Sequence, residues 1–525
     1  MDSPEPPRDG RLTRAEFVKG ATWAGAGLAL GALGACGGTS KSTTTARPRR
    51  GGTLKIAFIG GGSSETLDPN GPVADVDDAR AENLFDPLVS LAPDLSLAHY
   101  LAESFEPNAA FDAWTVRLRS GVTFHDGSPL TADDVIYTLR RIANPKLGLV
   151  GLYIANFINA NGIRKLDRLT LRIPLTQPNT LLPYFFAFDY MAIVKNGTTS
   201  FNHPIGTGPF KFVKWKPGQY STFTRNENYW QHGKPYVDTL ELVSIPDATA
   251  RYDALLGGQV DAIESISYAQ ATSQKQSKQF RVLEAQGSNM VPIYMAVDLE
   301  PFRDVRVRQA MRLIANRPQL VEEAQSGYGT IGNDIYGKHL PHYDTALPQR
   351  TQDLEQAKHL LKAAGREGLH VTLNTSTVAT GMLESATVFA RQAAGAGVTM
   401  SLNQQPSSIY FGPVYLKENF AQSEWFTEPL VTHYAKSLVQ GAPFNETHWH
   451  NARFQSLYDQ VLAESNSAKQ QDLYNELQKL LWDEGGYLIW GFYPILDGVG
   501  HRVGGMRPSP LGPLGGKAFT DVWVS

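Results

Sequence analysis

Carboxylates and histidines that stand close together are the first candidates for chemistry in this chain. Glu446, His448 and His450 alternate within five residues, and an extended strand would place both imidazoles on one face. Carboxylates and imidazoles can bind zinc, but a zinc site has three or four protein ligands, and this pattern does not identify the complete set. Surface histidines of a loop are the favoured interpretation, so we expect no metal and no cofactor.

Acid–base catalysis has one candidate pair, Asp133 and Asp134. Adjacent residues on a helix point about 100° apart, and Thr131 with Asp134 has the spacing of a capping box, so structural roles are favoured. The sequence contains no Gly-x-Ser-x-Gly elbow, no His-Glu-x-x-His helix and no Walker loop. We therefore predict that the protein is not an enzyme, with a secreted hydrolase as the alternative class.

Cys36 is the only cysteine among 525 residues, which excludes an internal disulfide. It follows an apolar segment, residues 21–33, that has signal-peptide length and is too short to span a bilayer. The stretch Leu33-Gly34-Ala35-Cys36 resembles the lipobox of bacterial lipoproteins, in which the thiol receives a diacylglycerol before cleavage. We therefore predict that Cys36 is lipidated and becomes the first residue of the mature chain.

The remaining composition is that of an ordinary globular protein. Residues 1–36 form the expected signal peptide, and residues 37–51, rich in Gly, Ser and Thr, form the expected flexible tether. The formal net charge is -3, so no strong field for nucleic acid is present. After the leader, no run of eighteen apolar residues occurs, and we expect membrane contact through the lipid alone.

Strand and helix patterns alternate along the rest of the chain. Residues 52–59 and 115–119 alternate like strands, and helices are expected from Thr131, from Asp304 and over residues 353–365. The helix after Asp304 should turn its apolar residues inward, namely Val307, Ala310, Met311 and Ile314, and its arginines outward, namely Arg306, Arg308 and Arg312. This mixture predicts an α/β protein.

Several blocks, in this order, resemble the family 5 extracellular solute-binding proteins of ABC importers, the group with the dipeptide- and oligopeptide-binding proteins. The resemblance covers nearly all of residues 52–500. The blocks are Leu101-Ala102-Glu103-Ser104-Phe105, residues 114–119, residues 122–135 with His125-Asp126-Gly127, Gly206-Thr207-Gly208-Pro209-Phe210, residues 226–230, and Phe302-Arg303-Asp304-Val305-Arg306-Val307-Arg308.

The resemblance implies a two-lobed clamp of the large type II periplasmic-binding-protein class with an additional inserted α/β domain. The crossing strand would be residues 288–297, with the return crossing near residues 497–500. In this chain the implied parts are lobe I, residues 52–87 plus 206–292 plus 499–525, the inserted domain, residues 88–205, and lobe II, residues 293–498.

The resemblance also implies where a ligand binds. In the peptide-binding members an aspartate that follows a tryptophan pairs with the ligand's ammonium group, and Glu428 stands at that place. Trp425, Phe426 and Thr427 would line the same site, and the crossing strand would bring Asn289 and Tyr294 near it. Two interpretations of Glu428 stay open, a ligand contact and a local ion pair with a basic side chain. A peptide or an amine-bearing compound is expected, and a polyamine, a cationic amino-acid derivative or an unrelated solute stays open.

The implied partners follow from the family. They are a small-molecule or peptide ligand and an ABC permease with its ATPase, and we expect a monomer that binds no nucleic acid. The protein would lie outside the cytoplasm, on the cell membrane or in the periplasmic space. A peptide-sensing or chaperone role without import is an alternative that the sequence does not separate from transport.

Overall fold

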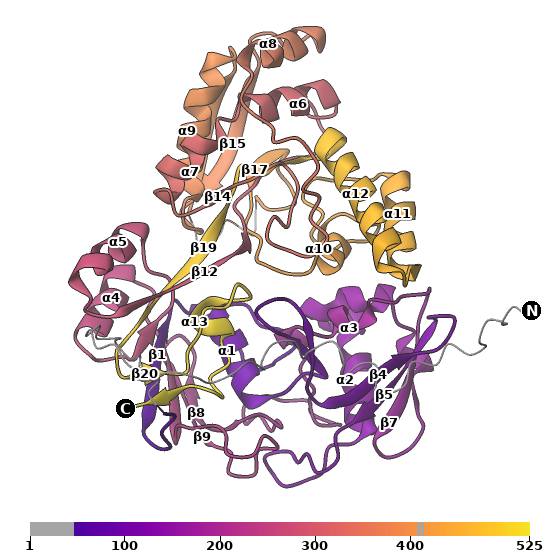
Figure 1. Ribbon diagram of the computed structural model, residues 1–525, viewed down its shortest axis with the longest axis vertical. Coiled ribbons are helices and arrows are strands. Elements are labelled where there is room, and N and C mark those ends of the chain that lie inside the picture. Colours follow the sequence, from indigo (N-terminus) through magenta and orange to yellow (C-terminus); the bar gives the residue numbers. More distant parts are fainter. Residues whose placement is uncertain (1–46, 407–409, 411–413) are drawn as a thin grey trace, which may run out of the picture. The chain divides into compact units, whose positions relative to one another are not determined.

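The computed structural model describes residues 47–406, 410 and 414–525, so the leader and Cys36 lie outside the described residues. Its largest sheet has the order β12-β19-β11-β1-β10-β9-β8, with β14 paired to β19 (Figure 1). The strands are β1 (Thr53–Phe58), β8 (Phe210–Lys216), β9 (Tyr220–Arg225), β10 (Thr239–Ser244), β11 (Ala262–Ile263), β12 (Arg281–Asn289), β14 (Thr330–Ile331) and β19 (Gly491–Val499). The predicted first strand is thus confirmed, and it lies inside this sheet.

Helices pack on both faces of this eight-stranded sheet. α1 (Asp75–Leu84) contributes Val76, Ala79 and Leu84 to a core shared with β1 and β10, while α4 (Ala248–Leu256) and α5 (Tyr268–Ser277) contribute to a second core with Ala57 and Leu496. Near the end of α1, Gly206 lies so close that a Cβ there would come within 1.9 Å of the Leu84 carbonyl oxygen. Only glycine fits at this contact, which explains the Gly-Thr-Gly-Pro block.

A second sheet has the order β16-β15-β17-β13-β18. Its strands are β13 (Ile293–Met295), β15 (His370–Ser376), β16 (Thr399–Gln405), β17 (Phe420–Gln422) and β18 (Tyr487–Leu488). The helices of this region are α6 (Val305–Ile314), α7 (Arg317–Gln325), α8 (Leu354–Ala363), α9 (Met382–Gly395), α10 (Leu430–Ser437), α11 (Ala452–Ala463) and α12 (Ser467–Glu484). α9 packs on β15 and β16, and the predicted helix over residues 353–365 is confirmed as α8 with Asp353 as its N-cap.

Two adjacent connections join these two sheets, and between them the short strand β14 returns to pair with the start of β19. β12 leads into β13, with Pro292 at the break, and β18 leads back into β19. The first crossing agrees with the prediction. The return crossing falls at residues 489–490, so the predicted position near residues 497–500 is wrong. Gly498 instead serves close packing, because a Cβ there would lie 2.6 Å from Leu255 Cδ2.

A four-stranded antiparallel sheet of order β4-β5-β7-β6 lies wholly within residues 88–205. Its strands are β4 (Ala102–Pro107), β5 (Ala113–Leu118), β6 (Arg164–Lys165) and β7 (Thr170–Pro174). The covering helix α2 (Ala132–Ile142) begins at the predicted capping box of Thr131 and Asp134. A short helix of the same part, α3 (Leu182–Phe185), lies beside α10. Both members of the candidate acid–base pair have structural partners. Asp134 accepts from the Thr131 N–H in the cap, and Asp133 forms an ion pair with Lys165 at 2.6 Å.

Helix α6 corrects the prediction that its arginines point outward. Its apolar residues are buried as expected, but Arg308 and Arg312 are 5% and 0% exposed, and only Arg306 is exposed. Both buried guanidinium groups donate to carbonyl oxygens at the C-terminal end of α12, those of Glu484 and Gly485 among them. Positive groups there satisfy unpaired carbonyls and complement the helix dipole. Arg308 and Arg312 therefore hold α6 and the end of α12 together.

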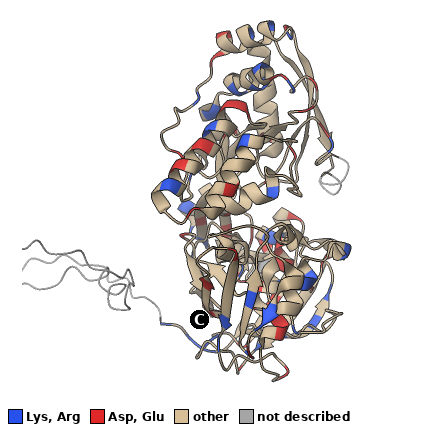
Figure 2. Cartoon of the chain, turned by 90° about the vertical axis from the view of Figure 1, so that its right-hand side faces the viewer, with Lys and Arg blue, Asp and Glu red and all other residues tan. Residues whose placement is uncertain are grey.

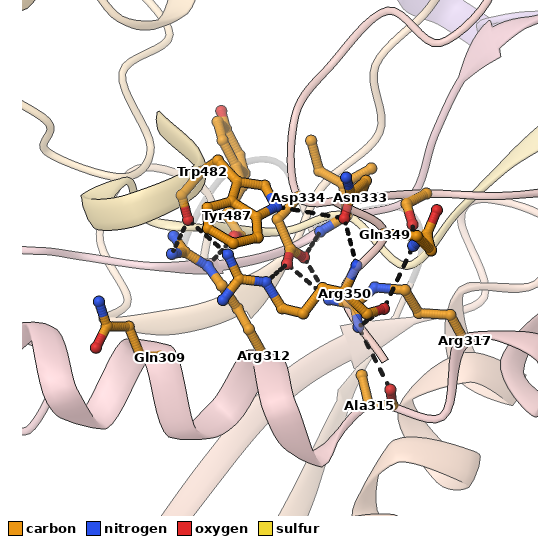
Figure 3. Close-up of polar contacts among 12 residues, drawn as sticks. Gln309, Arg312, Ala315, Arg317, Asn333, Asp334, Gln349, Arg350, Trp482 and Tyr487 are labelled. Carbon is orange, nitrogen blue, oxygen red and sulfur yellow. Dashed lines mark hydrogen bonds and ion pairs between the residues drawn. The ribbon is translucent and has the colours of Figure 1, made fainter. Parts of the chain in front are cut away.

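Close to Arg312, two further arginines surround one carboxylate (Figure 3). Arg317 and Arg350 lie 2.6 Å and 2.9 Å from Asp334, which is fully buried. The Arg350 guanidinium also lies 4.0 Å from the centre of the Trp482 ring. These contacts connect the loop after β14 to α7 and α12, so the cluster has a structural role.

Charges of both signs are interspersed along the helices in the view of Figure 2, in agreement with the small net charge. Within the described part of the chain, no helix combines the length and the apolar character that crossing a membrane requires.

Candidate functional site

The segment Glu424 to Pro429 connects β17 to α10 and carries most of the predicted site residues. Trp425 forms an isolated antiparallel bridge with Met290, just beyond the end of β12. Exposure alternates along the segment: Trp425 and Thr427 are buried, Glu424 is half-buried, and Phe426 is 56% exposed. This alternation is that of an extended strand, so Glu424 and Phe426 share the face opposite to Trp425.

Trp425 points into the protein, so of the two predicted aromatic wall residues only Phe426 is exposed. The Trp425 indole Nε1 donates to Glu446 Oε1 at 2.9 Å, and its ring meets the His433 ring edge-on, with centroids 4.6 Å apart. Glu446 also accepts from Ser423 Oγ at 2.6 Å and is fully buried. Burial raises the pKa of Glu446 to about 7, against the lowering effect of these hydrogen bonds.

Glu428 lies in a local ion pair, the second of the two open interpretations. Its carboxylate is 2.6 Å from Lys436 Nζ and 3.6 Å from His433 Nδ1, and both partners come from α10. Burial would raise the pKa of Glu428, but Lys436 and His433 outweigh it and hold that pKa below its usual value. Lys436 also lies over the Phe188 ring, 5.1 Å from its centroid. The carboxylate thus already has a cation from its own chain.

Asn289 and Thr427, two of the predicted site residues, contact each other. Asn289 Oδ1 accepts from the Thr427 backbone N–H at 2.8 Å and from its hydroxyl at 3.1 Å, and Ser288 N–H donates to Thr427 Oγ1 at 2.8 Å. Tyr294 lies apart from them. It is fully buried on β13, and burial, with a smaller effect of Glu446, raises its pKa.

The predicted set omits Glu424, whose carboxylate accepts a hydrogen bond of 2.7 Å from the Tyr493 hydroxyl of β19. Burial raises the pKa of Glu424 to about 7, and the Asp75 carboxylate at the start of α1 adds to the increase. Asp75 likewise raises the pKa of Glu264 and of Asp497, although burial is the larger cause for both. We call Asp75, Glu264, Glu424 and Asp497 the junction carboxylates. Their proximity has no signal in the local sequence.

The remaining sequence candidates have structural partners. His448 Nδ1 lies 2.7 Å from Asp298 Oδ1, and His450 is exposed. After β1, in the loop that begins with Gly60-Gly61-Gly62, the Gly61 N–H donates to Glu65, which is also bound to Arg80 at 2.8 Å. Within the described ranges, no three His, Cys, Asp or Glu side chains gather in a way that could hold a metal ion.

Comparisons with known proteins agree with this architecture. The glutathione-binding protein GsiB of Escherichia coli (strain K12) is 25% identical over 450 residues, which are 82% of this chain and 87% of that protein. In fold, the chain matches DppA from Helicobacter pylori in complex with the peptide STSA, with a TM-score of 0.79, 19% identity and coverage of 91% and 98% of the two chains. It also matches AppA from Bacillus subtilis in complex with a nonapeptide, with a TM-score of 0.77, 22% identity and coverage of 91% and 100%.

The profile of the bacterial extracellular solute-binding proteins, family 5 Middle, matches residues 97–434. That range contains the four-stranded sheet, the first crossing and the segment from Glu424 to Glu428. The matched structures have the two-lobed fold of periplasmic binding proteins. The chain therefore belongs to family 5 of the bacterial extracellular solute-binding proteins, the receptors of ABC importers.

Proposed function

We propose that this protein is a lipid-anchored receptor that closes its two lobes on a peptide or an amine-bearing solute and delivers it to an ABC permease and its ATPase. One observation carries the proposal: the neighbouring strands β12 and β19 of the eight-stranded sheet continue directly into β13 and from β18 of the five-stranded sheet (Figure 1). Two adjacent connections let two bodies rotate about a common line.

The strand order of the sheets supports a division into lobes. We propose that lobe I comprises residues 52–87, 206–292 and 491–525, which places all of β19 in it instead of beginning its last part at residue 499. Lobe II then comprises residues 293–490, whose short strand β14 pairs with the start of β19, and residues 88–205 form the inserted domain. Hydrogen bonds from Thr180 to the carbonyls of Leu462 and Glu464 join this domain to lobe II.

Such a receptor works by a shift of population and needs no covalent chemistry of its own. The ligand must bind the closed form better than the open form, because equal affinity for both would shift nothing. The permease then recognises the closed, loaded form. A lipid on Cys36 would hold the protein on the outer face of the membrane, since acyl burial contributes about 0.8 kcal/mol per methylene.

Native mass spectrometry of residues 37–525, purified without denaturation, tests the proposal when it is followed by identification of any retained molecule. We expect a peptide or an amine, and we expect the identified ligand to compact the protein in small-angle scattering. A verified tight ligand that leaves the scattering unchanged would contradict closure.

A further inference from the structure

The charge state of Glu428 raises the question of which group receives a ligand's positive charge. Glu428 is paired with Lys436 and is only 4% exposed. An incoming ammonium group would have to displace a lysine that is covalently part of the same site. The carboxylate at the position expected from the family is therefore already neutralised.

Glu424 is a carboxylate in the same segment that has no such partner. Among the residues that the structure describes, no lysine, arginine or histidine forms an ion pair with it, and its only hydrogen bond comes from Tyr493. Of the other junction carboxylates, Asp75 adds to the rise of the pKa of Glu424, although Asp75 itself pairs with Lys517 at 3.2 Å. A half-buried carboxylate in such surroundings is stabilised by a cation, because the cation offsets both desolvation and repulsion.

Asn289 supplies an independent sign of a missing partner. It is 1% exposed, its Oδ1 is held by Thr427, and within the described residues its Nδ2 has no hydrogen-bond partner. A buried donor without an acceptor costs about 1–3 kcal/mol. The Thr427 N–H donates to Oδ1, which fixes the orientation of the amide, so the unpaired atom is a donor that suits a carbonyl or carboxylate oxygen.

Asn289 and Glu424 are connected through Tyr493. Asn289 lies directly opposite Tyr493 in the β12–β19 ladder, so these two side chains share a face, and Tyr493 donates to Glu424. Asn289 Oδ1 also accepts from Thr427, in the segment that carries Glu424 and Phe426. A carboxylate and a buried, unpaired amide donor thus neighbour the same tyrosine, next to a segment with an exposed phenyl ring.

We propose that Glu424, and not Glu428, is the specificity-determining carboxylate, which receives the ammonium group of a ligand whose adjacent carbonyl oxygen accepts from Asn289 Nδ2. Phe426 then contacts the apolar part of that ligand. This combination selects solutes with a free amine next to a carbonyl and an apolar side chain, the chemistry of a peptide N-terminus. The inference rests on the proposed solute-binding function and names the ligand class of its site.

The test uses a mixed library of tripeptides with free amino termini and the same library after N-acetylation. Each is incubated with the mature chain, and retained peptides are quantified by native mass spectrometry, with compaction measured in parallel by scattering. We expect the wild type to prefer the free library by about 10- to 100-fold, the effect of one charge-assisted hydrogen bond. Glu424→Gln should remove that preference.

Two variants complete the test. Glu428→Gln should keep the preference in its folded fraction, and Glu284→Gln, which changes an exposed carboxylate on β12, should behave as wild type. Loss of the preference in Glu428→Gln but not in Glu424→Gln would overturn the inference, as would equal retention of both libraries or retention of neither. If acetylated peptides compact the protein as free peptides do, the receptor function is supported and the role of Glu424 is contradicted. If neither library compacts it, both the receptor function and the role of Glu424 are contradicted.

Discussion

Glu428 and Lys436 form an internal ion pair, and a double-mutant cycle measures its contribution to stability. The charged atoms are 2.6 Å apart, and the two side chains are 5% and 14% exposed. Two unit charges about 4 Å apart attract each other by about 4 kcal/mol at an effective dielectric constant of about 20. Desolvation of both groups offsets most of this attraction, so the intact pair adds little net stability. Removing one partner, however, lowers the free energy of unfolding strongly, because the other charge stays buried and unpaired.

Lys436→Met leaves the Glu428 carboxylate buried beside His433 alone, and we expect it to lower the free energy of unfolding by about 3 kcal/mol. Glu428→Gln leaves a lysine that is more exposed and can extend towards water, so we expect a smaller loss of about 1–2 kcal/mol. The double variant carries no buried charge and should lose about 1 kcal/mol or less, well below the sum of the single changes.

Urea unfolding of the four proteins, followed by circular dichroism, gives these free energies. Lys358→Met is the matched control, because Lys358 and Glu355 form an exposed pair at 2.8 Å, and it should cost less than about 0.5 kcal/mol. If Lys436→Met were as harmless as this control, or if the losses of the single variants simply added, Lys436 would not neutralise Glu428. Glu428 would then be free to receive a ligand's ammonium group, and Glu424 would not be needed for it.

Four further outcomes are expected. Cys36→Ser should release the protein from membranes or block leader cleavage, and unchanged retention on sedimented membranes would contradict lipidation. Arg312→Met should cost about 3 kcal/mol in urea unfolding, because it leaves buried carbonyls without donors, whereas the exposed Arg306→Met should cost little. Gly206→Ala should cost about 3 kcal/mol or more, since its Cβ would meet the Leu84 carbonyl, and a normal melting temperature would refute that contact. Burial raises the pKa of Glu446 from 4.5 to about 7, so the protonated carboxyl stabilises the fold below about pH 4.5, and this stabilisation is lost as the pH rises through 7. Glu446→Gln should therefore remove roughly 3 kcal/mol of the pH dependence of the unfolding free energy. Urea unfolding at pH 5 and at pH 8 measures it.

Features that depend on neighbours in the sequence could be predicted. The capping box at Thr131 and Asp134 lies within four residues, and it is present at the start of α2. Asp353 likewise caps α8, and the alternation of residues 53–58 forms β1. In each case the stabilising contacts are local, so the pattern of residue types contains the information that decides the structure.

The burial of Arg308 and Arg312 could not be predicted in the same way. A helical pattern with arginines on one face normally means a solvated face, and the partners that reverse this meaning are carbonyl oxygens near residue 485, far along the chain. Every residue has a backbone carbonyl, so the amino-acid sequence does not indicate which carbonyls will accept from an arginine. Only the position of α12 in the fold shows that these carbonyls lie next to Arg308 and Arg312. The same limit explains the misplaced return crossing, because strand pairing decides where the chain changes sheet.

The candidate site contains both kinds of contact, those between sequence neighbours and those between distant segments. His433 and Lys436 stand three residues apart on α10, directly after Glu428, so the spacing contained a signal for the local ion pair. Glu424 has no such local partner, and its environment comes from Tyr493, Asp75 and Asn289, which belong to three other segments. A family resemblance indicates a position for the ligand's charge, but the charge balance of the folded site decides whether a carboxylate at that position has room for another cation. Glu428 has Lys436 as its cation, whereas Glu424 has no ion pair with any described residue, which is why we propose Glu424 for this role.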